Sequence, residues 1–183
     1  SPEQTKAVED YAAADKRITD VETTPMLRGN WVSIAGKTIE EMQPIPHEVA
    51  MLGERDVPVS WAATVPDGSK VVAGDWWPAD YKGPPLVSLA EEMHQFMNMN
   101  VGDTIPMSLS GGPPLTAKIA NFRYVDWANA QLNFGVLFSP GAADESAATY
   151  LTLIQSAKED EKSLTRDLAL KFPDIALIGI GDT

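Results

Sequence analysis

The chain has 183 residues, and its 44% of hydrophobic residues is enough to build a packed core rather than a disordered chain. Its 14 Lys and Arg against 26 Asp and Glu give a formal net charge of -12. This charge would repel a phosphate backbone, so nucleic acid is not an expected partner. The absence of cysteine excludes disulfide scaffolds, thiolate metal sites and cysteine nucleophiles.

No stretch approaches the roughly 18 apolar residues that span a bilayer, and the chain starts at Ser1 rather than at methionine. We therefore expect a segment of a longer protein. The run "SPE" is typical of a helix start, and Val8, Tyr11 and Ala12 share one face of the helix that follows. "ITDVETTPML" predicts a strand, and "LRGNWVSIAGK" a bent strand or strand pair with a turn at "AGK". Prolines and glycines predict a loop over residues 40–58.

The middle of the chain predicts two hairpins and a helix. "VSWAATV" and "KVVAG", joined by "PDG", predict the first hairpin. The S-x-x-E pattern at Ser88 matches a capping box, and it predicts a helix whose apolar stripe is Leu89, Met93, Phe96 and Met97. The strict alternation of "TIPMSLS" and of "LTAKIANF", joined by "GGPP", predicts the second hairpin.

The last third predicts two strands, a helix and a final strand. "QLNFGVLFSP" and "TYLTLIQS" are short apolar runs typical of strands. "AKEDEKSLTRDLALKF" predicts a helix with acids at its start and a lysine at its end, which both suit the helix dipole. Ala157, Leu164, Leu168 and Phe172 line its inner face. "FPDIALIGIG" predicts a buried strand. A helix, a turn, an aspartate and a strand thus occur near both ends, which favours one layer built from both ends with the middle inserted.

Catalytic patterns are sparse. His47 lies in a predicted loop and His94 lies beside the apolar stripe, and their spacing fits no metal-ligand motif. The acid pairs Glu40–Glu41 and Glu91–Glu92 and the run 159–161 fit helix starts or solvated faces better than two carboxylates facing each other across a glycosidic bond. No G-x-S-x-G elbow occurs. We therefore predict no catalytic residue, no cofactor and no metal site, and hence no enzyme.

The tryptophans are the strongest remaining signal, above all the adjacent pair in "GDWWPADYKGPP". Such rings either fill a β-rich core or form a sugar- or lipid-binding surface. Because neighbouring residues of an extended segment face opposite ways, we expect one of Trp76 and Trp77 to be buried and the other to be available. These two residues are therefore the candidate contact for a hydrophobic cargo or a partner. The five tryptophans are Trp31, Trp61, Trp76, Trp77 and Trp127.

Several runs occur in an order that resembles a known family. They are "PMLRGNWVSIAGK", "SKVVAGDWWPADYKGPPLVSLAEEM", "NMNVGDTI" with "AKIANFRYVDW", "NFGVLFSPG" and "FPDIALI". Together they resemble the extracytoplasmic domain of FtsX/MacB-type ABC transporter permeases, in particular the YbbP-like branch. The resemblance spans nearly the whole chain. The V-x-G-D run is shared across the superfamily, whereas "RGNWVSIAGK" and "VVAGDWWP" are specific to the branch.

The resemblance implies an α+β fold with two lobes, a MacB-like periplasmic core domain. Residues 1–58 and 128–183 would form a split porter lobe of βαβ-type units, and residues 59–127 an inserted, β-rich Sabre-like lobe. The hairpin from Ile105 to Ile119 would belong to the inserted lobe.

The resemblance also implies a function. The segment would be the periplasmic domain of an inner-membrane permease in bacteria, and it would be non-catalytic. ATP hydrolysis by a cytoplasmic ABC ATPase would change its conformation, for export or extraction of a hydrophobic or lipid-like substrate. A periplasmic lipase-type partner is a further implied contact. We expect the isolated domain to be monomeric and the full transporter dimeric. No adaptor-binding motif is recognisable.

Two alternatives remain open at this point. The first is a carbohydrate- or lipid-binding module that uses the tryptophans, or a glycan hydrolase that also uses the paired acids. The second is a scaffold that recruits a partner enzyme such as a secreted lipase.

Overall fold

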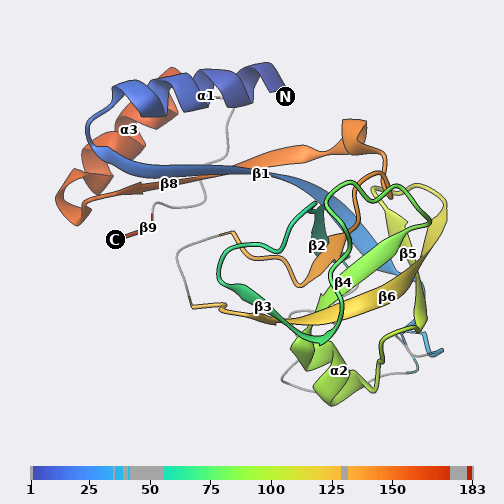
Figure 1. The fold of residues 1–183 in the computed structure, drawn as a ribbon. Helices are drawn as coiled ribbons and strands as arrows, with labels where there is room; N and C mark the ends of the chain where they lie inside the picture. The colour runs from blue at the N-terminus through green and yellow to red at the C-terminus, as the bar shows by residue number, and fades with distance from the viewer. Residues whose placement is uncertain are drawn as a thin grey trace. The chain divides into compact units, whose positions relative to one another are not determined.

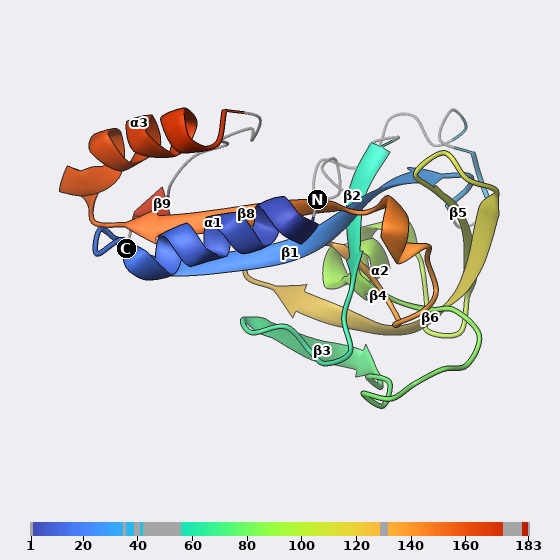
Figure 2. The same ribbon diagram turned by 90° about the horizontal axis from the view of Figure 1, so that it is seen from above.

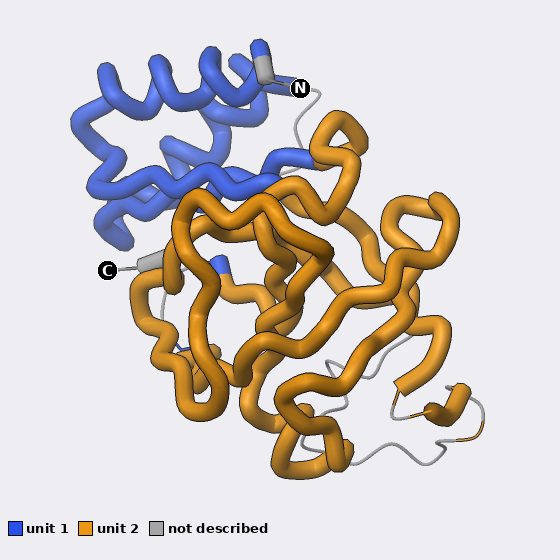
Figure 3. The backbone as a smooth tube through the Cα atoms, turned by 45° about the vertical axis from the view of Figure 1, so that its right-hand side comes forward, with its two compact units in different colours: residues 1–25, 128–132, 149–183 blue, residues 26–127, 133–148 orange. Residues whose placement is uncertain are grey.

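The computed structural model describes residues 2–34, 36–38, 41, 56–128, 132–173 and 181–182. The chain divides into two compact units (Figure 3). Unit 1 consists of Ser1–Pro25, Ala128–Leu132 and Thr149–Thr183, and unit 2 of Met26–Trp127 and Asn133–Ala148. The predicted porter-like and Sabre-like lobes have other boundaries, and their assignment stays a prediction.

Unit 1 contains helix and strand from both ends of the chain (Figure 1). Its helices α1 and α3 pack through buried side chains onto β8, and α1 runs along β1 and β8 in both ribbon views (Figures 1 and 2). The elements are α1 (Pro2–Ala14), the first part of β1 (Ile18–Trp31), β8 (Thr149–Ser156), the 3-10 turn η4 (Lys158–Asp160), α3 (Glu161–Lys171) and β9 (Gly181–Asp182).

The core of unit 1 confirms the predicted apolar faces of both helices except at Ala157, which precedes the 3-10 turn η4, so that α3 starts only at Glu161. Val8 of α1 and Leu164 and Leu168 of α3 are buried against Ile154 of β8. Four half-buried side chains complete the cluster: Tyr11, Ile18, Val21 and Phe172. Most of the predicted last strand, at residues 174–180, lies outside the described residues.

Unit 2 is built mainly of strands that form a closed ring. Its elements are the last part of β1, β2 (Asp56–Trp61), β3 (Ser69–Gly74), β4 (Leu86–Ala90), α2 (Glu91–Met97), β5 (Thr104–Leu109), β6 (Pro114–Val125), β7 (Val136–Phe138) and the 3-10 turn η3 (Glu145–Ala147). The strand order is β2-β7-β4-β6-β5-β1, and β2 also pairs with β1. The order therefore closes on itself, as in a small β-barrel, and β3 adds to β6.

The interior of this ring holds the main hydrophobic core. Val59 of β2, Leu89 of β4, and Ile119 and Phe122 of β6 are fully buried there. Packing is so close that β1 needs a glycine. A Cβ on Gly29 would lie 2.7 Å from Sδ of Met107 and 2.9 Å from a methyl group of Val59, inside van der Waals contact.

The predicted hairpin at residues 104–122 is confirmed. β5 and β6 pair antiparallel, with Ile105 opposite Ala117 and Met107 opposite Leu115. The strands predicted in "QLNFGVLFSP" and "TYLTLIQS" are also confirmed as β7 and β8. The predicted turn at "AGK" is present, because Ile34 and Lys37 exchange backbone hydrogen bonds of 2.7 and 2.9 Å.

The other predicted hairpin is wrong. β2 pairs with β1 and β7, and β3 pairs with β6, so the two strands joined by "PDG" are not partners of each other. Residues 42–55 of the predicted loop lie outside the described residues, and residues 56–58 belong to β2 instead of a loop. β2 takes part in the closed ring, whereas β3 lies outside that order and adds to β6.

The capping box at Ser88 is wrong as well. Ser88 lies inside β4 and is completely buried, and α2 starts only at Glu91, with Ala90 at its N-cap. The Ser88 hydroxyl is engaged with Asn121 and Arg123 and does not cap the helix. The predicted helical stripe is shortened accordingly, since only Met93 and Met97 are buried from α2 and Phe96 is 43% exposed.

The mixture of a large sheet with three α-helices agrees with the predicted α+β class. The finer statement of a two-lobed MacB-like fold stays a prediction.

Candidate functional site

The tryptophan pair lies in the segment between β3 and β4, and its start is fixed by Gly74. This residue has φ of 73°, and a Cβ there would overlap the carbonyl oxygen of Ala120 on β6. Only glycine meets both conditions without strain. The segment leaves β3 while still held to β6, because the amide of Asp75 donates to the same Ala120 carbonyl over 3.3 Å.

Trp76 and Trp77 are stacked on each other. Their ring centroids are 4.2 Å apart with an interplanar angle of 31°. The indole N–H of Trp76 donates to the carbonyl of Ala63 over 3.0 Å, and that of Trp77 donates to Ala62 over 2.9 Å. Both polar ends are thus satisfied by consecutive carbonyls of the segment that follows β2, as expected for aromatic N–H groups in a partly buried place.

The burial of the two rings differs as predicted, but their orientation does not. Trp77 is buried, with 4% of its surface exposed, and Trp76 is half-buried. The prediction that they face opposite ways is wrong, because both rings turn towards the Ala62–Ala63 carbonyls. One face of the Trp76 indole lies on Trp77, so the pair has one inner ring and one outer ring.

The rest of the segment is a tight corner. The Tyr81 amide donates to Pro78, and the Tyr81 hydroxyl donates to Pro84 over 2.7 Å. The Pro85 carbonyl accepts from the Lys118 amide on β6. These bonds hold the segment on the wall of unit 2 at both ends. The outer face of Trp76 is therefore presented from a rigid support.

Of the two histidines, His47 lies outside the described residues, and His94 is engaged within unit 2. His94 Nδ1 lies 2.7 Å from the Met99 carbonyl, and its ring packs on Phe122 with centroids 5.0 Å apart. His94 thus ties the end of α2 to the following turn and to β6. Within the described ranges, no group of metal-ligating side chains could hold a metal ion.

The acid pairs are also engaged locally or solvated where they are described. Glu92 Oε1 accepts from the Trp127 indole N–H over 3.4 Å. Glu159 is exposed on η4. Glu40 lies outside the described residues, and Glu41 Oε1 accepts from the Thr38 hydroxyl over 3.1 Å.

A polar cluster inside unit 2 was not predicted. Arg123 is only 1% exposed, and its Nε donates to the Ser88 hydroxyl over 2.6 Å. Ser88 donates in turn to Asn121 Oδ1. The sequence contains a pattern that indicates this cluster. Asn121 and Arg123 continue the alternation by which Ala117 and Ile119 face inward along β6.

An ion-pair network was missed in unit 1. Arg17 pairs with Asp15 at 2.7 Å and with Asp167 of α3 at 2.9 Å, and it donates to the Ser163 hydroxyl over 3.1 Å. The hydrogen bonds from Arg17 lower the pKa of Asp15 to about 2. The same carboxylates raise the pKa of Arg17. The network fixes the turn after α1 against α3.

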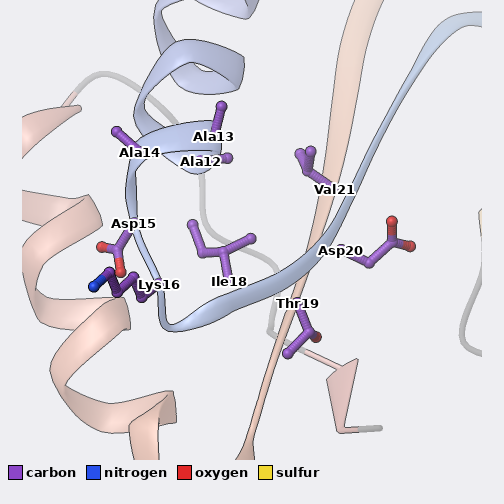
Figure 4. A pocket seen from close by; sticks show the side chains of 9 residues that line it. All are labelled: Ala12, Ala13, Ala14, Asp15, Lys16, Ile18, Thr19, Asp20 and Val21. Atoms are coloured by element: carbon purple, nitrogen blue, oxygen red, sulfur yellow. The ribbon is translucent and has the colours of Figure 1, made fainter.

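An open hollow of about 420 Å³ lies beside this turn (Figure 4). Its wall is formed by one continuous stretch of chain from the end of α1 into β1. Alanine side chains and Ile18 form its apolar part, and Lys16 and Asp20 are exposed at its rim. The hollow has no convergent set of polar groups of the kind that orients a small ligand.

The comparison with known proteins shows to which class of proteins the chain belongs. Part of the chain is similar to an ABC transporter permease, so this is an ABC permease-related domain. The relative is the uncharacterized ABC transporter permease YbbP of Escherichia coli (strain K12), which is 31% identical over 127 residues. The match covers 69% of this chain but only 15% of the length of YbbP. No protein-family model matches the chain. Among the described residues, no helix combines the length and apolar character that crossing a membrane requires.

Proposed function

We propose that the chain is the periplasmic domain of an FtsX/MacB-like ABC transporter permease of the YbbP-like branch. The observation that carries this proposal is the 31% identity to a permease over 69% of the chain. The arrangement in two compact units, one of which contains both ends of the chain, supports the split two-lobed organisation. In this proposal the porter-like lobe is 1–58 with 128–183, and the Sabre-like lobe is 59–127.

The domain would act mechanically rather than catalytically. A cytoplasmic ABC ATPase would move the membrane part of the permease, and the two units would respond outside the membrane. The contacts of the polar residues support this role, since His94, Arg17 and Arg123 are each engaged in hydrogen bonds or ion pairs that stabilise the fold. The cargo would be exported or extracted, and it would be hydrophobic or lipid-like.

The outer ring of the tryptophan pair is the proposed contact for that cargo or for a lipase-type partner. Trp76 is half-buried, its N–H is already bonded, and its support is rigid. What it can offer is an apolar face, which suits an acyl chain or an apolar side chain.

The location can be tested with a single cysteine, because the chain has none of its own. Lys82 is exposed in the corner that carries the tryptophan pair. In the full-length permease, Lys82→Cys should react with a membrane-impermeant maleimide in cells whose inner membrane is intact. Labelling only after the inner membrane is disrupted would place the segment on the cytoplasmic side and would contradict the proposal.

The cargo contact can be tested with dansyl-labelled lysophosphatidylcholine as the probe. We expect Trp76→Ala to weaken binding of this probe at least about tenfold, the size of one lost aromatic contact. Tyr124→Ala is the control, since Tyr124 is an aromatic side chain 47% exposed on β6. Equal binding by the two variants would exclude Trp76 as the contact. Trp76-dependent binding of a glycan instead of the lipid probe would favour the carbohydrate-binding alternative.

A further inference from the structure

Unit 2 buries a cation among neutral partners. The Arg123 guanidinium donates to the Ser88 hydroxyl over 2.6 Å, to the Phe134 carbonyl over 2.9 Å and to the Ser69 hydroxyl over 3.4 Å. These oxygens come from β4, from the approach to β7 and from β3. None carries a charge, and Arg123 makes no ion pair in the part of the chain that the structure describes.

A carboxylate oxygen that lacks a partner lies close by, because Arg123 pairs with Ala90 in the β4–β6 register and Glu92 follows Ala90 by two residues, in the first turn of α2. Glu92 of α2 accepts from Trp127 through Oε1, whereas its Oε2 is buried without a hydrogen bond. Burying a charged oxygen without a hydrogen-bond partner costs more folding free energy than burying a neutral polar group in the same way. An unmet acceptor of this kind therefore calls for a donor that the protein atoms alone do not supply.

The charges of the two residues are coupled. Burial lowers the pKa of Arg123 to about 10, and the negative charge of Glu92 acts in the opposite direction. The guanidinium therefore remains protonated at neutral pH. It has five N–H donors, of which three are used by Ser88, Phe134 and Ser69. Two donors are left for a further acceptor.

We propose that Glu92 is the counter-ion of Arg123 and that one buried water molecule bridges Oε2 of Glu92 and a free N–H of the guanidinium. Water is the group that fits, because it donates to the carboxylate and accepts from the guanidinium, and buried waters in proteins make 2–4 such bonds. The bridge joins α2 to β3, β4 and β6 through one charged centre. It is a conformational lock, since α2 cannot leave the ring without separating two buried charges.

A matched pair of substitutions tests the ionic part. Glu91 and Glu92 both lie in the first turn of α2, so Glu91→Gln and Glu92→Gln remove the same charge from the same helix end. We expect Glu92→Gln to lower the folding equilibrium constant at least about tenfold more than Glu91→Gln does. Equal effects would overturn the assignment of Glu92 as the counter-ion.

The coupling itself is measured by a double-mutant cycle with Arg123→Met, which keeps the length of the side chain without its charge. We expect the folding equilibrium constant of the double variant Glu92→Gln/Arg123→Met to be at least about fivefold larger than the product of the two single effects predicts. Independent effects would contradict the pair.

A high-resolution crystal structure of the unmodified chain tests the bridge even where Arg123→Met does not fold. We expect a water within hydrogen-bond distance of both Glu92 Oε2 and the Arg123 guanidinium. A Glu92 side chain turned into bulk solvent, with no water between the two groups, would overturn the proposal.

Discussion

The two units are stabilised in different ways. Unit 2 closes its strands into a ring around a large cluster of fully buried side chains, including Leu89, Ile119 and Phe122. The described core of unit 1 is smaller and consists of Val8, Ile154, Leu164 and Leu168 with a few half-buried neighbours. Unit 1 adds the Arg17 ion-pair network at the turn after α1. Because burial of apolar area is the main source of stability, unit 2 should be the more stable unit and unit 1 the more sensitive to pH.

The difference can be measured because the two units carry different probes. All five tryptophans lie in unit 2, whereas the two longest helices, α1 and α3, lie in unit 1. We expect the helices of unit 1 to unfold at a lower urea concentration than unit 2. The far-UV circular dichroism signal should therefore change before the tryptophan fluorescence does. Coincident transitions would show that the chain unfolds as a single cooperative unit and would break the comparison.

The largest single effect is expected in the ring of unit 2. Phe122 is fully buried on β6, and its ring packs against His94. Phe122→Ala should lower the free energy of unfolding of unit 2 by about 3–5 kcal/mol, the range for deleting a buried aromatic side chain. The shift should be seen in the urea midpoint of the tryptophan fluorescence. A loss of under about 1 kcal/mol would contradict the central place of this residue in the core.

A buried leucine tests the smaller core. Leu164 is completely buried on α3, so Leu164→Ala should cost unit 1 about 2–5 kcal/mol. The effect should appear in the circular dichroism transition and leave the tryptophan transition in place. Leu170 provides the control on the same helix, since it is 75% exposed, and Leu170→Ala should change stability by no more than about 0.5 kcal/mol. Similar losses for both leucines would refute the assignment of the inner face of α3.

The smallest effect is a dependence on pH. Arg17 lowers the pKa of Asp15 to about 2 in the folded chain, below the value of about 3.9 for an unfolded aspartate. The stabilisation is therefore fully present above about pH 4 and is lost as the pH falls towards 2. Asp15→Asn removes the titrating carboxyl group, so it should reduce the loss of stability of unit 1 in acid, measured by circular dichroism. Asp20→Asn, at an exposed position of β1, should leave it unchanged; an equal effect of both would contradict the Arg17 network.

Strand pairings between segments close together in the sequence can be predicted, whereas pairings between distant segments cannot. The β5–β6 hairpin is local, and the alternation of Ile105, Met107, Ala117 and Ile119 predicts it correctly. The parallel pairings of β2 with β7 and of β4 with β6 join segments far apart in sequence, which no local pattern encodes. Burial against these partners is also why Ser88 lies in a strand although its neighbours match a capping box.

The candidate site shows the same limit. The alternation of an extended segment predicts that Trp76 and Trp77 differ in burial, and they do, although the two rings pack on each other instead of facing opposite ways. The sequence does not indicate that both indoles donate to Ala62 and Ala63, since that contact depends on how the ends of β2 and β3 approach each other. The partners of Arg123 are not indicated by the sequence for a related reason, since they come from three other segments.

The proposed movement of this domain on ATP hydrolysis can be measured as a distance in the full-length permease with its ATPase. Leu170→Cys in unit 1 and Lys82→Cys in unit 2 place spin labels at exposed positions of a segment without native cysteines. Pulsed electron paramagnetic resonance should give one distance distribution without nucleotide and a different one with ATP trapped by vanadate. An ATPase variant that cannot bind ATP should keep the first distribution. The same distribution in every nucleotide state would contradict the account.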